Sequence, residues 1–109
     1  MRRFASLCRQ ADYARLRRQG RRVSTKSLII YRGPPFTGDP TSLVGITVSK
    51  SIGKAVIRNK LRRRLAAIVH EALARQRTMR LLVVARPIAA AASYPDLRGE
   101  VTSALGPVY

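Results

Sequence analysis

The chain has 109 residues, enough for one domain with a modest core and little more. It carries 22 Lys and Arg against 5 Asp and Glu, a formal charge of +17, and 18 of its cations are arginine. Arginine donates paired hydrogen bonds to phosphates and base edges. The composition therefore predicts a single nucleic-acid-binding domain over residues 1–109, and a hydrophobic content of 46% excludes a merely disordered basic tail.

The same sequence disfavours a membrane protein and a protein held together by disulfides or a cysteine-bound metal. No apolar run approaches the ~20 residues of a membrane span, and no basic segment has the Trp-, Phe- and Leu-rich face of an interfacial anchor, so we expect no membrane partner. Cys8 is the only cysteine, which excludes an internal disulfide and a cysteine-based metal site. The first residues, MRRFASLCRQADY, lack the apolar region of a secretory signal. We therefore expect a cytoplasmic location.

The first half of the chain predicts a helix and then strands. Residues 11–19 are expected to be a short helix with Tyr13 and Leu16 on one face, ended by Gly20 in the left-handed conformation. The runs SLIIYR (27–32) and SLVGITVS (42–49) are rich in β-branched and apolar residues and are expected to form an antiparallel pair. Residues 21–26 are a possible third strand, and a loop rich in Pro and Gly separates the other two.

The second half predicts a long helix, a strand and a closing helix. From residue 56 to 74 there is no Gly or Pro, and five residues recur at the spacing of one buried helical face: Ile57, Leu61, Leu65, Ile68 and Ala72. RLLVVAR (80–86) is expected to be a strand buried on both faces. A last helix is expected at 93–105, where Ser93 and Asp96 have the spacing of a capping box.

These elements predict an α+β fold in the order α-β-β-β-α-β-α. About four strands would form a small sheet with helices packed mainly on one face. The open face could hold a single-stranded nucleic acid, because aromatic rings stack on bases while surrounding cations hold phosphates. Tyr13 and Tyr31 are the candidate rings. The alternative is that both only fill the core or its rim.

The densest positive charge lies on the long helix. Around its buried stripe, Arg58 and Arg62 are expected on one flank and Lys60 and Arg64 on the other, while Asn59 and Arg63 point directly away. A solvated helix normally mixes the signs of its charges. On this helix the first acid is Glu71, which follows the basic block. The like charges therefore oppose folding unless a polyanion neutralises them.

Catalytic constellations are absent from the sequence. His70 is the only histidine, and the five acids are scattered singly, so there is no carboxylate pair for acid–base chemistry or for two metal ions. No glycine-rich phosphate loop occurs either. We therefore expect no catalytic side chain and no metal ion or cofactor bound by the protein itself.

The segment VSKSIGKAVIRNKLRRRL (48–65) resembles the signature of the bacterial ribonuclease P protein component, in which a basic helix follows a strand and a turn. The resemblance covers nearly the whole chain. DYARLRRQG is similar to the family's first helix, SLIIYR to its first strand, LVGITVSK to its glycine-containing strand and LLVVARP to its apolar strand.

This resemblance implies a subunit that binds a large catalytic RNA and precursor tRNA and promotes removal of the tRNA 5′ leader, while the RNA and its Mg²⁺ ions perform the hydrolysis. It also implies a left-handed βαβ crossover, an exception to the usual handedness. The positions that match RNA-subunit contacts are Lys50, Lys54, Arg58, Asn59, Lys60, Arg62 and Arg63. The leader would lie between the sheet and the first helix, at Tyr13, Arg17 and Tyr31. No small-molecule substrate is implied.

Some positions depart from the family pattern. Ser51 stands at the signature's second lysine and Lys60 at an arginine, while Arg17 occupies a frequently aromatic position, so one leader contact could be electrostatic. A structural ribosomal RNA-binding protein would share the charge, the size and the open sheet, and is the main alternative. A protein-only nuclease would need clustered acids, which the sequence lacks.

Overall fold

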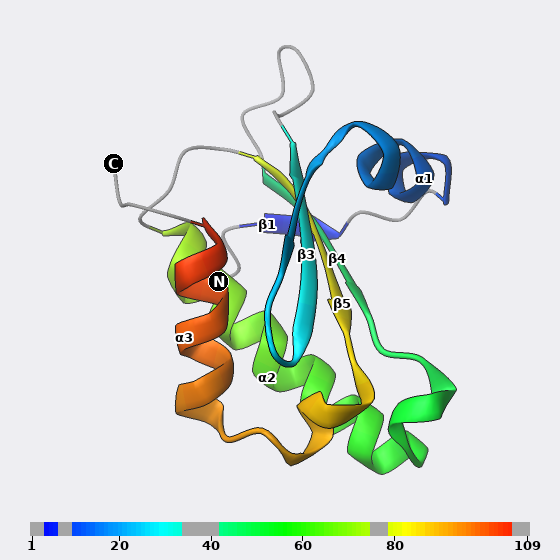
Figure 1. Cartoon of the computed structure of the whole chain (residues 1–109), viewed down its shortest axis with the longest axis vertical. Helices are drawn as coiled ribbons and strands as arrows, with labels where there is room; N and C mark the ends of the chain where they lie inside the picture. Colours follow the sequence, from blue (N-terminus) through cyan, green and yellow to red (C-terminus); the bar gives the residue numbers. More distant parts are fainter. Residues whose placement is uncertain (1–3, 7–9, 34–41, 75–78, 106–109) are drawn as a thin grey trace.

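The computed structural model describes residues 4–6, 10–33, 42–74 and 79–105 (Figure 1). In chain order, the elements are β1 (Phe4–Ser6), α1 (Gln10–Gln19), β2 (Arg21–Ser24), β3 (Leu28–Gly33), β4 (Ser42–Thr47), the 3₁₀ turn η1 (Lys50–Ile52), α2 (Ala55–Leu73), β5 (Arg80–Ala85), the 3₁₀ turn η2 (Pro87–Ala91) and α3 (Tyr94–Leu105). The expected order of helices and strands is confirmed. The short strand β1, which the sequence did not signal, precedes it.

The strands form one 5-stranded sheet in the order β1-β4-β5-β3-β2. β1, β4 and β5 are parallel, whereas β3 runs antiparallel to both β5 and β2. The expected direct pairing of residues 27–32 with 42–49 is wrong, because β5 lies between β3 and β4. β5 is the most apolar strand, and its residues Leu81, Leu82 and Val83 are fully buried in the central position. This confirms the prediction of a strand buried on both faces.

The helices are divided unequally between the two faces of the sheet. In Figure 1, α2 and α3 lie on one side and α1 lies on the other, near one end of the strands. The main core lies under α2 and α3 and includes Ile30 of β3, Val44 of β4 and Val83 of β5. A smaller cluster on the other face joins Leu16 of α1 to Leu82. Helices mainly on one face were predicted, and α1 leaves part of the second face uncovered.

The buried stripe of α2 differs from the predicted stripe at both ends. Leu61, Leu65 and Ile68 are buried as expected, and Val69 and Leu73 join them. Ile57, however, is 43% exposed. It lies in the first turn of α2, where its side chain is next to Gly53, the residue that follows η1. Ala72 is half-buried and packs against the edge of the core, while residues 69 and 73 are fully part of it.

Gly20 ends α1 for a reason other than the predicted left-handed conformation. Among the described glycines, only Gly53 has a positive φ, at 149°. Gly20 instead approaches the helix closely: its N–H donates to the Leu16 carbonyl at 2.8 Å, and a Cβ at this position would lie 2.4 Å from the same oxygen. A larger residue at position 20 would therefore displace α1 from the sheet.

The C-terminal half connects β4 to β5 through α2 and then adds α3. β4 and β5 are parallel neighbours, so β4, α2 and β5 form the βαβ unit to which the implied left-handed crossover applies. The predicted cap of α3 is present, since the N–H of Asp96 donates to Ser93 Oγ at 3.2 Å. In the part of the chain that the structure describes, no helix has the length and apolar character to cross a membrane.

Candidate nucleic-acid interface

A basic strip runs along the side of α2 that faces away from the sheet. It consists of Arg58, Asn59, Lys60, Arg62 and Arg63. All are exposed except Arg58, which is half-buried at the flank of the strip. This agrees with the helical arrangement predicted from the sequence. Within the strip, Arg62 Nη1 donates a hydrogen bond of 3.3 Å to Asn59 Oδ1.

The acids whose side chains the structure describes lie away from the basic strip, and two of them have other partners. Glu71, near the other end of α2, forms an ion pair with Arg98 of α3. Glu100 binds the backbone of Ser27, and Asp96 is in the first turn of α3. Among the described residues, no carboxylate pairs with any cation of the strip. The positive charge of α2 is therefore uncompensated over its first turns, which favours a polyanion as its partner.

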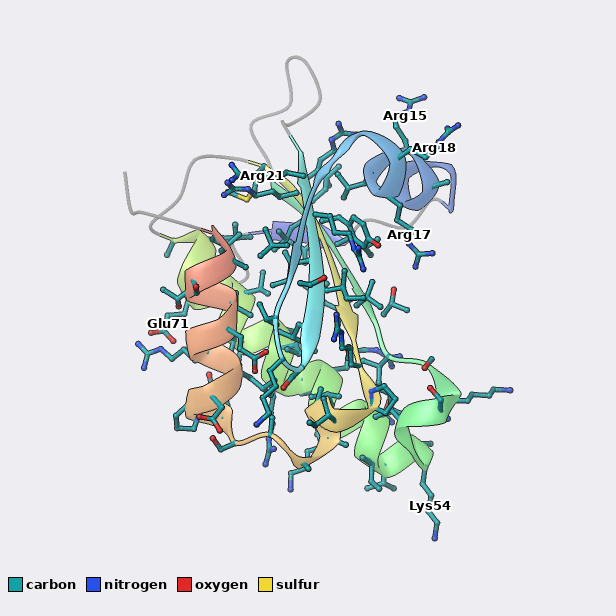
Figure 2. All side chains as sticks on the ribbon, in the orientation of Figure 1. Arg15, Arg17, Arg18, Arg21, Lys54 and Glu71 are labelled. Atoms are coloured by element: carbon teal, nitrogen blue, oxygen red, sulfur yellow. The ribbon has the colours of Figure 1, made fainter. Side chains whose placement is uncertain are left out.

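The start of α2 adds two more cations to this surface. Lys50 in η1 and Lys54 at the N-cap of α2 are both exposed, and Figure 2 shows the Lys54 side chain pointing away from the body of the molecule. The first turn of α2 contains no acid, and no side chain caps its N–H groups. The Ser49 and Ser51 hydroxyls hydrogen bond to each other at 2.7 Å, so η1 is held as a tight turn before the helix.

The face of the sheet opposite α2 and α3 carries two rows of side chains that α1 does not fully cover. From β4 to β2, the rows are Gly45, Leu82, Tyr31 and Arg22, and Thr47, Val84, Ile29 and Ser24. Gly45 and Leu82 are buried, Arg22 and Ser24 are exposed, and the other four are half-buried. We call these rows the open sheet face. α1 covers the next row, where Leu16 Cδ1 would lie 3.0 Å from a Cβ on Gly33. Apolar strands bordered by cations are a surface on which unstacked bases can lie.

Tyr31 lies at the centre of this face. It is half-buried and packs against the cluster of Leu16 and Leu82. Its cross-strand neighbour on β2 is Arg22, which is exposed. The ring therefore has one side against the core and remains partly accessible beside a cation. The two sequence interpretations of Tyr31, packing residue and base platform, are both compatible with this position.

The two predicted leader positions on α1 differ in what the structure describes. Figure 2 shows Arg17 pointing from α1 along the side of the sheet, whereas Arg15 and Arg18 point outward. All three are exposed. Tyr13 belongs to α1, but its side chain lies outside the described part of the structure, so its predicted proximity to Tyr31 remains a prediction.

The turn η1 connects the strand that carries part of the open sheet face to the helix that carries the basic strip. β4 carries Thr47 of the open face, and three residues later Lys50 begins the turn that leads into α2. In Figure 1, η1 and the start of α2 project beyond one end of the sheet, while α1 lies near the other end on the open side. One nucleic-acid partner on α2 and a single strand on the sheet would therefore occupy different sides of the molecule, with Lys50 in the connection between them.

The sequence interpretation did not assign three further residues of the candidate interface. Two lie on the side of the open sheet face and one lies on α2. Arg22 shares the row of Tyr31, and its place follows from strand alternation once β2 is paired with β3. Arg86 follows β5 in extended conformation, so alternation places it on the side of Leu82 and Val84. Val56 is 77% exposed at the start of the basic strip, although helical periodicity alone gave it no role. These residues are identified only by the strand pairing and by the exposure of their side chains in the structure.

The described residues include no group of three or more His, Cys, Asp or Glu side chains that could hold a metal ion. His70 lies half-buried on α2, away from the basic turns at the start of that helix. The side chains of the strip and of the sheet face are cationic, amide or apolar. Such groups bind phosphates and bases through charge, hydrogen bonds and stacking.

Comparison with known sequences identifies relatives across the whole chain. The pattern of the family "Ribonuclease P" matches residues 1–109. The ribonuclease P protein component of Acidothermus cellulolyticus is 39% identical over 101 residues, which cover 92% of this chain and 84% of that protein. The protein of the same description from Thermobifida fusca is 36% identical over 104 residues, covering 89% of this chain and 71% of that protein.

Solved structures share the fold at lower sequence identity. A mutant RNase P protein from Staphylococcus aureus, described as defective in mRNA degradation, superimposes with a TM-score of 0.81 at 22% identity, covering 90% of this chain and 82% of that one. The RNase P protein of Thermotoga maritima in complex with 1-(4-fluorophenyl)-2-thiourea gives 0.80 at 19% identity, covering 94% and 99%. These similarities confirm the α+β fold predicted from the sequence.

Proposed function

Since this chain belongs to the bacterial ribonuclease P protein component family, we propose that it is the protein subunit that binds ribonuclease P RNA and the 5′ leader of precursor tRNA in the cytoplasm. The observation that carries the proposal is the basic strip of α2, which has no acidic partner among the described residues and is connected through η1 to a sheet face that α1 covers only in part. The first surface suits a folded RNA, and the second suits a single strand. The family assignment favours this role over that of a structural ribosomal protein.

In this proposal the RNA subunit binds along α2 and η1. Lys50, Lys54, Arg58, Lys60, Arg62 and Arg63 neutralise phosphates, while Asn59 contributes a neutral amide that can contact a base edge or a 2′-hydroxyl. Contacts to phosphates supply affinity and position the RNA, whereas a hydrogen bond from an amide to a base edge or a 2′-hydroxyl can distinguish one RNA structure from another. The hydrogen bond from Arg62 to Asn59 Oδ1 leaves the Asn59 amide N–H groups pointing away from Arg62, available to an RNA acceptor.

The leader of the precursor would lie on the open sheet face and beside α1. Tyr31 supplies a ring for stacking, and Arg22 next to it supplies a charge for the backbone. Arg17 would contact a phosphate from the α1 side, and Tyr13 would add a second ring. Mature tRNA lacks this strand, so the same face would distinguish substrate from product.

Bond cleavage is assigned to the RNA subunit and to Mg²⁺ held by it, and the role of the protein is to bind and orient. Charge neutralisation near the RNA would lower the Mg²⁺ concentration needed for activity, because bound cationic side chains replace part of the counterion atmosphere. No side chain of this chain is given a step in the hydrolysis.

The test is reconstitution with a bacterial ribonuclease P RNA and labelled precursor tRNA. At low Mg²⁺, addition of the protein should produce cleavage at the mature 5′ end, and the protein without the RNA should produce none. The variant Arg62→Ala/Arg63→Ala should require more protein for the same cleavage, whereas Arg15→Ala/Arg18→Ala removes the same charge from the outward side of α1 and should not. Protein that leaves cleavage unchanged at every Mg²⁺ concentration would contradict the proposal.

A further inference from the structure

The start of α2 exposes two adjacent apolar side chains on its most basic segment. Val56 is 77% exposed and Ile57 is 43% exposed, the former being the most exposed large hydrophobic residue that the structure describes. Single exposed apolar residues are common on protein surfaces. Two consecutive exposed apolar residues within a cationic surface need an explanation, because an apolar patch rimmed by polar groups is typical of an interaction site.

Grooves lie on both sides of Val56. One, of about 430 Å³, runs between α2 and η2, with a floor of Leu61, Ala90 and Ala91 and with Lys60 and Arg64 at its edge. The other is lined by the opposite flank of the helix, through Asn59, Arg62, Arg63 and Ala66. Val56 is therefore an apolar ridge between two cation-lined depressions. The small alanine side chains of η2 keep the first groove open next to the ridge.

The charges at the edges of the grooves indicate the kind of occupant. No described acid lines either groove, so a partner with negative charge outside and an apolar surface inside is complementary to them. A nucleotide has this character, with a flat apolar base face on one side and a phosphate on the other. Apolar side chains that insert beside bases while cations hold the flanking backbone are a known mode of nucleic-acid binding.

We propose that Val56 and Ile57 contact an unstacked nucleobase of the RNA subunit, which enters the groove between α2 and η2 while Lys60 and Arg64 hold its flanking phosphates. This inference rests on the proposed function and adds a base contact to a surface otherwise assigned to phosphates. It gives this part of α2 a preference for RNA with an extruded base over uniform duplex. An acidic amphipathic peptide is the alternative occupant.

The test uses Val56→Thr, which keeps the branched shape but places a hydroxyl where a methyl group would meet the base. Ile88→Thr is the matched control, because Ile88 is 47% exposed on η2 and lines neither groove. Val56→Thr should weaken binding of the ribonuclease P RNA about fivefold, the equivalent of losing one buried methyl group, and the control should not. The dependence of affinity on salt should be unchanged, because no charge is removed.

Chemical probing of the bound RNA separates this contact from the phosphate contacts. With wild-type protein, a small number of nucleobases should be protected from dimethyl sulfate or carbodiimide, and hydroxyl radicals should show the backbone footprint of the strip. Val56→Thr should restore reactivity of those bases and leave the backbone footprint in place. Unchanged base reactivity with an intact footprint would overturn the base contact and leave the phosphate contacts of the strip in place.

Two other results have equally definite meanings. If wild-type protein gives no backbone footprint on the RNA, the proposed function fails, and this contact fails with it. If Val56→Thr weakens RNA binding only together with a fall in melting temperature and without any change in base reactivity, Val56 acts through folding and the base contact is overturned.

Discussion

The carboxylate of Glu100 on α3 accepts a hydrogen bond of 2.7 Å from the backbone N–H of Ser27, in the turn between β2 and β3. The carbonyl of Ser27 accepts from the N–H of Arg86 at 2.9 Å, so both backbone groups of this buried residue are satisfied. The contact ties α3 to the edge of the sheet that carries Arg22 and Tyr31. An acidic side chain thus serves the scaffold of a strongly basic protein.

This contact predicts an acid-sensitive contribution to stability. Burial alone would raise the pKa of Glu100, but hydrogen bonds from Thr25 and Ser27 and the charge of Lys26 together lower it below its ordinary value. The ionised form therefore stabilises the fold above the unfolded pKa, and this stabilisation is lost as the pH falls through the folded pKa. Glu100→Gln should lower the free energy of unfolding at pH 7 by about 1 kcal/mol, and the difference from wild type should shrink as the pH falls through the lowered pKa of Glu100.

Urea denaturation followed by circular dichroism at several pH values measures this difference. Glu71→Gln is the control, because it removes an exposed carboxylate that pairs with Arg98 and should change stability little. A difference between wild type and Glu100→Gln that stays constant into the acid range where carboxylates are protonated would show that the charge of Glu100 is not what binds Ser27.

Local patterns in the sequence predicted the elements better than their spatial arrangement. Periodicity identified α2 and its basic side, because the spacing of apolar residues follows directly from helix geometry. It could not show that the first turn of α2 extends past the sheet, which leaves Ile57 exposed. Nor could it place β5 between β3 and β4, because strand order depends on the path of the connecting helix and on competition for the central position.

The candidate site shows the same division between local and long-range information. The cations of the basic strip were found as one group because they are close together on one helix. Arg22 was not linked to Tyr31, although both were in expected strands, because their adjacency depends on the register of β2 with β3. Val56 was overlooked because a helical pattern gives the direction of a side chain but not whether another element covers it.

The basic strip predicts a salt-dependent affinity for the RNA subunit. Each phosphate neutralised adds on the order of −0.7 to −0.9 to the slope of log affinity against log salt. Arg62→Ala/Arg63→Ala should therefore flatten the slope by between about one and two. Filter binding of labelled RNA over a range of KCl concentrations gives the slope. Arg15→Ala/Arg18→Ala, with the same loss of charge, should leave it near the wild-type value; equal flattening by both pairs would indicate a diffuse field instead of contacts along α2.

Asn59 should contribute in a different way from its charged neighbours. Because its amide is neutral, Asn59→Ala should weaken RNA binding by about 1 kcal/mol without altering the salt slope. Asn59 accepts a hydrogen bond from Arg62, so the two residues should also be coupled. A double-mutant cycle of Asn59→Ala and Arg62→Ala should give non-additive losses of affinity. Strict additivity would mean that the hydrogen bond between them plays no part in the bound state.

The uncompensated charge of α2 also predicts that anions stabilise the isolated protein. Anions that bind the folded state raise its melting temperature, whereas simple screening affects all exposed charges alike. Sulfate or pyrophosphate should therefore raise the melting temperature more than NaCl of equal ionic strength, by several degrees for about 1 kcal/mol of binding energy. Arg62→Ala/Arg63→Ala should reduce the difference between the two salts. Equal melting temperatures in sulfate and NaCl would argue against an organised anion site.

The open sheet face predicts that Tyr31 contributes to the preference for precursor over mature tRNA. Stacking of a base on an aromatic ring stabilises binding by ~1–3 kcal/mol, and only the precursor has a leader to stack. Tyr31→Leu keeps an apolar side chain against Leu16 and Leu82 but removes the ring. In the reconstituted holoenzyme it should therefore reduce the affinity ratio of precursor to mature tRNA by about fivefold or more. Binding of the ribonuclease P RNA should be unchanged.

The matched control for this experiment is Tyr94→Leu. Tyr94 is 37% exposed at the start of α3, on the side of the sheet opposite the open face, so its loss should not alter the preference for precursor. Shortening the leader to a single nucleotide should bring wild type and Tyr31→Leu to the same affinity, because the stacked base is then missing in both. If Tyr31→Leu lowers only the melting temperature and keeps the wild-type preference, Tyr31 is a packing residue. The leader would then have to lie nearer Arg17 and Lys50, whose exposed charges border the same face.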